Sequence, residues 1–284
     1  MFPSHNMDML ELRFSEVANL LEMIDIFGLI IISFAFIGIA YDALKKKQRS
    51  YKEASANIII GITNGLLNMT FYGLIFVITL WFAEQVAFND IPVNLWTWVM
   101  AIIAADFSYY WMHRIEHKVR FFWTIHSVHH SSTEFDLTTG LRLAWLEGLI
   151  EWIFFVPMIL VGFDMVQAIA SILIVVAYQA WIHTEHIGKL GYLDHVLNTP
   201  SVHRVHHGSN PHYIDKNFGG ILMIWDKLFG SYQAEQEIVI YGLTKNIGTT
   251  NPITINFYEW ISLIKDLQKT KSIKEKWALI SRPP

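Results

Sequence analysis

The sequence has 284 residues, of which 53% are hydrophobic and only 16% are charged. Soluble domains carry about 25% charged residues, so this composition excludes an ordinary soluble domain, a disordered chain and a coiled coil. A formal net charge of −4 gives no reason to expect nucleic acid as a partner. The absence of cysteine excludes disulfides, thiolate metal sites and cysteine nucleophiles. We therefore predict an all-α integral membrane protein.

Apolar segments predict about four to five transmembrane or re-entrant helices. Residues 24–44 are long enough for one crossing. They are followed by basic residues between 45 and 52, which place that loop in the cytoplasm by the positive-inside rule. Residues 58–83 and 93–112 predict two further crossings. Residues 143–182 predict a helical hairpin that leaves and re-enters on the cytoplasmic side.

The remainder of the chain predicts a polar cap on the same side. From residue 183 onward no segment is long and apolar enough to span, so we expect a helical, His-rich cytoplasmic cap. Residues 1–284 are expected to form one domain, with the functional region at about 106–230. Glu147 and Glu151 lie four residues apart in the first arm of the hairpin. An unpaired carboxylate is costly in lipid, so they should face protein or the functional site.

Histidine is the unusual residue type, with 13 copies in an otherwise apolar chain. Ten of them fall into four short clusters, and each cluster lies at or just beyond the predicted cytoplasmic end of a membrane segment. His5, His195 and His212 stand apart and are expected to be ordinary polar residues. The clusters are His113-x-x-x-His117, His126-x-x-His129-His130, His183-x-x-His186 and His203-x-x-His206-His207.

Helical spacing gives these clusters a metal-binding interpretation. Residues at i and i+4 share a helix face, so His113 and His117 can direct two imidazoles to one point. In each His-x-x-His-His cluster we expect the first two histidines to share a face and the third to point towards a second ion. A set of nitrogen ligands without thiolates suits zinc, copper, iron or nickel. The sequence therefore predicts a site for two metal ions.

Acidic residues near the clusters are candidates for orienting the ligands. Asp106 and Tyr110 share a helical stripe with His113, but Asp106 lies about 10 Å away along the axis. We expect it to orient a ligand of another helix or to make a polar contact between helices. Other acidic residues near the clusters are weaker candidates. Those considered as metal ligands or ligand-orienting residues are Asp106, Glu134 and Asp226, together with His186; Asp136, Glu185 and Asp215 lie nearby.

These motifs resemble the fatty acid hydroxylase/sterol desaturase superfamily, whose members are membrane di-iron oxygenases. The resemblance extends over about 106–260 and includes the three histidine boxes, Leu137-Thr138-Thr139-Gly140-Leu141-Arg142 and Trp181-Ile182-His183-Thr184-Glu185. The distal blocks around residues 198–208, 214–220 and 225–230, with Tyr241-Gly242-Leu243, are most similar to the alkylglycerol monooxygenase branch.

The resemblance implies a ligand set for two iron ions. His183 stands where the family has a further ligand, whereas His186 matches no residue of the branch. Val202 stands where the branch tends to carry another histidine, and Thr133-Glu134 shifts an acidic residue by one position. The box residues implied as iron ligands are His113, His117, His126, His129, His130, His203, His206 and His207.

The same resemblance implies O2-dependent hydroxylation, or desaturation, of a C–H bond in an ether lipid, a fatty acyl lipid or a sterol-like lipid. Electrons would come from an external donor, either a donor protein or a reduced tetrahydropterin. The main alternative is a His-rich membrane metal transporter or metal sensor. Transporters usually place their ligands near the membrane midplane, whereas these histidines follow the ends of the predicted spans. A cytochrome b-type haem protein would need histidines inside the spans, and the spans upstream of His113 contain none.

Overall fold

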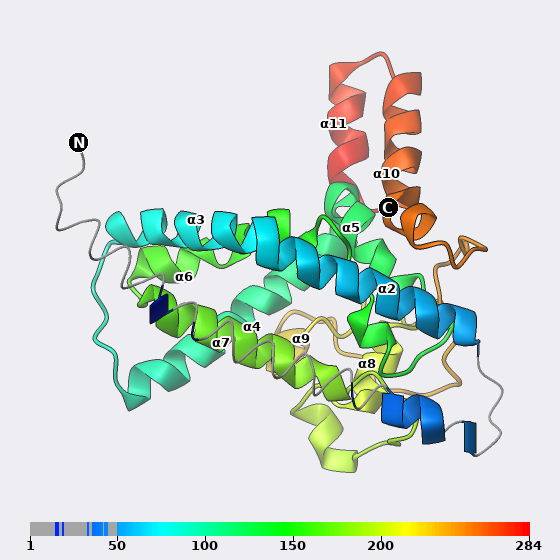
Figure 1. Ribbon diagram of the computed structural model, residues 1–284, viewed down its shortest axis with the longest axis horizontal. Coiled ribbons are helices and arrows are strands. Elements are labelled where there is room, and N and C mark those ends of the chain that lie inside the picture. The colour runs from blue at the N-terminus through cyan, green and yellow to red at the C-terminus, as the bar shows by residue number, and fades with distance from the viewer. Residues whose placement is uncertain (1–14, 17–18, 20–32, 34–35, 42, 45–49) are drawn as a thin grey trace.

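A computed structural model describes residues 15–284 except 17–18, 20–32, 34–35, 42 and 45–49. The described residues form helices and irregular segments without a strand, so the predicted all-α class is confirmed (Figure 1). The described residues also contain two isolated antiparallel β-bridges, one between Leu197 and Leu222 and one between Gly208 and Tyr241. They fasten the loops that surround the histidines.

One long helical segment forms an edge of the molecule (Figure 1). It comprises α2 (Tyr51–Leu67), a π-helical turn η1 (Asn68–Tyr72) and α3 (Gly73–Gln85). The Ser50 hydroxyl caps α2 by accepting a hydrogen bond from the backbone N–H of Glu53 at 3.3 Å. The predicted crossing at 58–83 is therefore part of a longer helical segment that contains a π-turn.

The first histidines lie on α4 (Leu95–Lys118), which begins at a capping box formed by Asn94 and Thr97. This helix continues past residue 112, where we predicted the third crossing to end. The extended backbone of Val119 separates it from α5 (Arg120–His130). α4 packs along α7 (Met165–Tyr178). The largest apolar cluster lies between these helices, α3 and α6 (Val156–Val161).

The hairpin predicted at 143–182 is only half helical, which corrects our expectation for its first arm. That arm consists of the 3₁₀ turns η3 (Glu147–Leu149) and η4 (Glu151–Phe154) and the six-residue α6. Glycine at 148 and proline at 157 disfavour a continuous helix there. Glu147 and Glu151 are half-buried rather than exposed, as predicted. Gly162, at φ = 117°, makes the turn into α7.

No helix within the described ranges is both long enough and apolar enough to cross a membrane. The crossing predicted at 24–44 lies mostly outside the described residues, as do most of the basic residues at 45–52. The predicted sidedness therefore stays a prediction.

The chain after α7 wraps around the histidine clusters. The last two helices form a hairpin that stands away from the body in Figure 1, with α10 packed on α5. The remaining elements are η2 (Thr139–Leu141), η5 (Gln179–Trp181), η6 (Gly191–His195), α8 (Pro200–His206), α9 (Ile224–Leu228), α10 (Pro252–Lys269) and α11 (Ile273–Ser281).

Candidate metal centre

Nine histidines meet in two adjacent groups, and within each group the ligand nitrogens lie within 4.8 Å of one another. They come from α4, α5, α8 and the turn that follows η5. Eight of the nine are buried and His126 is partly buried, so the interior of the protein contains an unusually polar set of side chains. We name the groups site A and site B. Site A contains His113, His117, His126, His130 and His206, and site B contains His129, His183, His203 and His207.

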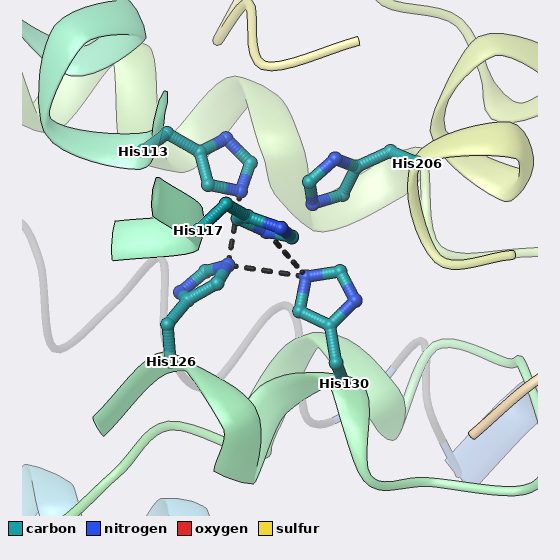
Figure 2. A group of neighbouring side chains, drawn as sticks. All are labelled: His113, His117, His126, His130 and His206. Atoms are coloured by element: carbon teal, nitrogen blue, oxygen red, sulfur yellow. Dashed lines mark hydrogen bonds between the residues drawn. The ribbon is translucent and has the colours of Figure 1, made fainter. Parts of the chain in front are cut away.

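The side chains of site A converge on one point (Figure 2). Nε2 of His126 lies 3.0 Å from Nε2 of His113 and 3.1 Å from Nε2 of His130. Metal–imidazole bonds are about 2.1 Å long. Two such bonds that meet at a right angle at the metal place the two nitrogens about 3.0 Å apart, so the observed spacing of the nitrogens fits a metal ion. Nε2 of His206 is buried and has no hydrogen-bond partner among the described residues. A metal ion would satisfy it, so the donor set fits one.

Site B repeats this arrangement with four imidazoles. Nε2 of His183 lies 2.9 Å from Nε2 of His203 and 3.2 Å from Nε2 of His129, and Nε2 of His207 lies 3.2 Å from Nε2 of His203. Nδ1 of His203 is buried and meets no hydrogen-bond partner in the part of the chain that the structure describes. Site B therefore also has the ligand spacing of a metal site, with fewer ligands than site A.

The two His-x-x-His-His clusters divide between the sites differently from our prediction. In each cluster the first and third histidines share a site and the middle one joins the other site. His126 and His130 belong to site A while His129 belongs to site B. His203 and His207 belong to site B while His206 belongs to site A. At about 100° per residue, i+4 returns to within about 40° of the starting direction and i+3 only to within about 60°. The i, i+4 pair therefore converges better.

In site A, four imidazoles are held by oxygen atoms that contact Nδ1, the ring nitrogen that faces away from the centre of the site. Nδ1 of His126 lies 3.2 Å from Oε2 of Glu116, and Nδ1 of His117 lies 3.5 Å from Oδ1 of Asp215. Two backbone carbonyls hold the others, with His113 Nδ1 3.0 Å from the Phe218 oxygen and His206 Nδ1 2.9 Å from the Lys216 oxygen. When Nδ1 donates to these oxygens, the lone pair of Nε2 faces the centre.

In site B, backbone carbonyls hold two of the rings. Nδ1 of His183 lies 3.0 Å from the Gln179 oxygen, and Nδ1 of His129 lies 3.3 Å from the Arg142 oxygen. Arg142 is itself only 1% exposed. Its guanidinium donates to Glu53 at 2.8 Å and Asn57 at 2.7 Å on α2, and to Ser131 after α5. This hydrogen-bond network connects α2 to the C-terminal end of α5, which carries histidines of both sites.

Burial keeps the imidazoles in the form that binds metals. Desolvation lowers the pKa of His183 to about 4. It also lowers the pKa of His207 well below its usual value, and the neighbouring imidazoles of His129 and His203 lower it further. Neutral imidazole at neutral pH is ready to coordinate a cation without first losing a proton.

His186 lies outside both groups. It is exposed, and its ring meets the ring of Tyr41 edge-on at 5.3 Å between centroids. The i, i+3 spacing to His183 would bring them together only on a helix, and η5 ends at Trp181. Of the other histidines, His195 bonds to the Tyr232 hydroxyl at 3.0 Å, His212 is exposed, and His5 lies outside the described residues.

The acidic candidates shape the surroundings of the sites. Asp106 accepts hydrogen bonds from the backbone N–H groups of Ile221 and Leu222 and from the indole of Trp225, so it holds a loop and orients no histidine directly. Glu134 accepts a hydrogen bond from the backbone N–H of Ser50 at 2.6 Å.

Asp226 acts through the backbone. It accepts hydrogen bonds from the N–H groups of Phe218 and Gly219. The Phe218 carbonyl in turn faces His113, so Asp226 supports that ring indirectly. Glu116 was missed in the sequence, although it is the one acidic residue between the first two histidines.

A cavity of about 640 Å³ lies against the histidines. His117, His130 and His206 of site A and His207 of site B line it, together with Trp123. Its remaining lining carries charges of both signs, including Arg120, Lys245, Arg282, Asp215, Glu259 and Asp266. The cavity therefore offers a small polar molecule access to the edge of both sites.

Comparison with known proteins supports the resemblance seen in the sequence. Residues 98–231 match the family model described as fatty acid hydroxylase. The match covers all nine histidines of the two sites.

Among individual relatives, human alkylglycerol monooxygenase is 39% identical over 233 residues, which is 82% of this chain and 52% of the relative. Alkylglycerol monooxygenase from Danio rerio is 43% identical over 198 residues, 69% of this chain and 44% of the relative. An ornithine lipid hydroxylase from Rhizobium tropici is 28% identical over 139 residues, 47% of this chain and 41% of the relative. The chain thus spans about half the length of these relatives. No solved structure matches it.

Proposed function

We propose that this protein is a membrane-bound di-iron oxygenase that uses O2 to hydroxylate a C–H bond of a lipid, with an ether lipid as the first substrate to test. The observation that carries the proposal is the pair of buried all-imidazole groups inside the segment that matches the fatty acid hydroxylase family model. The relatives' names, which describe hydroxylation of lipids and mono-oxygenation of alkylglycerols, support the choice of substrate class. Desaturation is the variant reaction that the same superfamily allows.

The nine histidines are the proposed ligands, five for one iron and four for the other. Bound iron would supply the redox chemistry needed to activate O2. The protein's own contribution is to keep the imidazoles neutral, to hold Nδ1 of six of them against oxygen acceptors, and to exclude water by burial. Rings fixed in this way need no reorganisation when metal binds.

We propose that the substrate arrives from a membrane. The end of α3, the start of α4 and the segment between them expose large apolar side chains, including Phe82, Phe88, Leu95 and Trp96, the last of which is 77% exposed. Apolar patches of this kind usually contact membranes or partners. The active site would then lie on the cytoplasmic side, as the basic residues before α2 predict.

The electrons for the reaction must come from a donor. The 640 Å³ cavity falls in the size range of small-molecule sites, and Trp123 offers a surface on which a planar ring can stack. The resemblance of the sequence motifs to the alkylglycerol monooxygenase branch implies a reduced tetrahydropterin in this role. A donor protein docking over the same opening is the alternative partner.

The proposal is tested by comparing the lipids of cells that do and do not express the protein under ¹⁸O2. We expect one labelled hydroxylated lipid, or a shortened ether lipid derived from it, and about two irons per purified chain, one for each group. His129→Ala and His206→Ala should abolish the product, whereas His212→Ala, at an exposed position outside both groups, should not. Full activity without iron would contradict the mechanism. Redistribution of cellular metal without any lipid change would favour a transporter or sensor instead.

A further inference from the structure

We propose that the two metal sites are unequal, and that site A binds its ion more tightly and fills before site B. Glu116 and Asp215 are the positioning residues that create the difference. The inference rests on the proposed function, because it assumes that both groups bind metal. It goes further by assigning an order and a cause.

Site A is backed by two carboxyl groups. Glu116 is 3% exposed and lies on α4 between His113 and His117, with Oε2 3.2 Å from Nδ1 of His126. Asp215 has φ = 60°, so the chain adopts an uncommon conformation at the position that faces His117. Its other oxygen lies 2.5 Å from Nζ of Lys118. This ion pair holds the Asp215 side chain in place next to the ring.

Site B has no comparable support among the contacts of the described residues. Its rings meet the carbonyl oxygens of Gln179 and Arg142, which carry no net charge. Nδ1 of His203 has no hydrogen-bond partner within the described ranges. Site B also has four imidazoles where site A has five. It differs from site A in ligand number, in charge behind the ligands and in the fixing of the rings.

All three differences favour site A for a divalent cation. A carboxyl oxygen that accepts from Nδ1 raises the basicity of the imidazole and supplies negative charge near the ion. Each such partner is typically worth about 10- to 100-fold in metal affinity. In a buried site these charges are poorly screened, so the carboxyl groups should matter more than they would at the surface.

The test is an anaerobic titration of the full-length, metal-free protein with ⁵⁷Fe(II), followed by Mössbauer spectroscopy and by competition with a chelator. We expect the first equivalent to give one quadrupole doublet and the second equivalent to give another, with dissociation constants at least about 10-fold apart. His126→Ala leaves four imidazoles in site A and removes the ring that contacts Glu116, so the first doublet should change and the first equivalent should bind more weakly. His207→Ala should remove the second and leave the first unchanged.

Two conservative variants test the cause. Glu116→Gln and Asp215→Asn keep the hydrogen-bonding shape but remove the ionisable carboxyl group, and each should weaken the first equivalent about 10- to 100-fold. Glu275→Gln makes the same chemical change at an exposed position on α11, which carries no proposed ligand, and should leave both constants unchanged. Circular dichroism verifies that each variant is folded; Asp215→Asn, at the less buried position, provides the test if Glu116→Gln fails to fold.

Equal affinities, a first doublet that is unchanged in His126→Ala, or loss of the second equivalent in Glu116→Gln would overturn the inference while leaving two-iron binding intact. Absence of iron binding in the unmodified protein would overturn the proposed function as well.

Discussion

Replacing Arg142 with methionine tests how much of the site's framework depends on one buried cation. The guanidinium is enclosed, and it donates to Glu53, Asn57, Ser131 and the Val128 carbonyl. Methionine has a similar length but no donors. Arg142→Met therefore leaves the Glu53 carboxylate, which is 8% exposed, without its cation.

Breaking a buried ion pair from one side typically costs about 3–5 kcal/mol, because the remaining charge stays uncompensated. In chains of about 150–250 residues, each kcal/mol of lost stability lowers the melting temperature by about 2–4 °C. The melting temperature of Arg142→Met should therefore fall by roughly 6–20 °C. Removing both charges is less costly than removing one. The double variant Glu53→Met/Arg142→Met should therefore recover at least half of the lost stability.

Thermal unfolding followed by circular dichroism in detergent measures both values, and iron analysis reports on His129, which the Arg142 carbonyl orients. A decrease in melting temperature of less than about 2 °C in the single variant would refute the conclusion that the buried Arg142 side chain stabilises the packing of α2 against α5. A double variant less stable than Arg142→Met would show that the cost lies in lost packing and not in the unpaired charge.

Other predictions concern the histidines and their neighbours. A Cβ on Gly140 would lie 3.0 Å from Nδ1 of His183, so Gly140→Ala should lower iron content towards one per chain, whereas Gly65→Ala, with open space around it, should not. The metal-free protein should lose stability as pH falls from about 6.5 to 4, since the unfolded chain then binds protons that folded His183, with a pKa of about 4, does not. The slope is about 1.4 kcal/mol per pH unit for this group, and thermal unfolding at several pH values measures it. Iron removal by a chelator should lower the melting temperature, and iron re-addition should restore it; an unchanged value would mean that iron does not bind the folded protein in preference to the unfolded chain.

The sequence predicted the members of the site better than their arrangement. Spacing on helices singled out eight of the nine histidines, because clusters at i+3 and i+4 bring imidazoles onto one face. His183 came from a cluster that the structure does not place on a helix, and the family resemblance implied its role. Spacing placed His126 with His129, whereas the structure pairs His126 with His130, since both spacings are compatible with a shared face. His186 was included because spacing alone does not show that η5 ends before it.

The fold was predictable in class but not in detail. Hydropathy identified the apolar segments, yet it could not detect the π-turn after Leu67 or the 3₁₀ turns at 147–154. These departures depend on tertiary contacts. Gly148, for example, lies so close to Asn68 that an added Cβ would be 2.0 Å from its side-chain oxygen. Glu116 was overlooked because its partner, His126, lies on another helix.

The segment from Lys216 to Phe218 orients two histidines through carbonyl oxygens and not through side chains. Peptide oxygens are common to all amino acids, so these contacts leave no signature in the sequence. A distant homologue with another residue at 216 would keep the contact to His206, provided its backbone follows the same path. The Asn217 side chain helps to fix that path by donating to the Val202 and Gln233 carbonyls. Divergence at position 216 is therefore a poor guide to loss of activity, and substitution at position 217 is a better one.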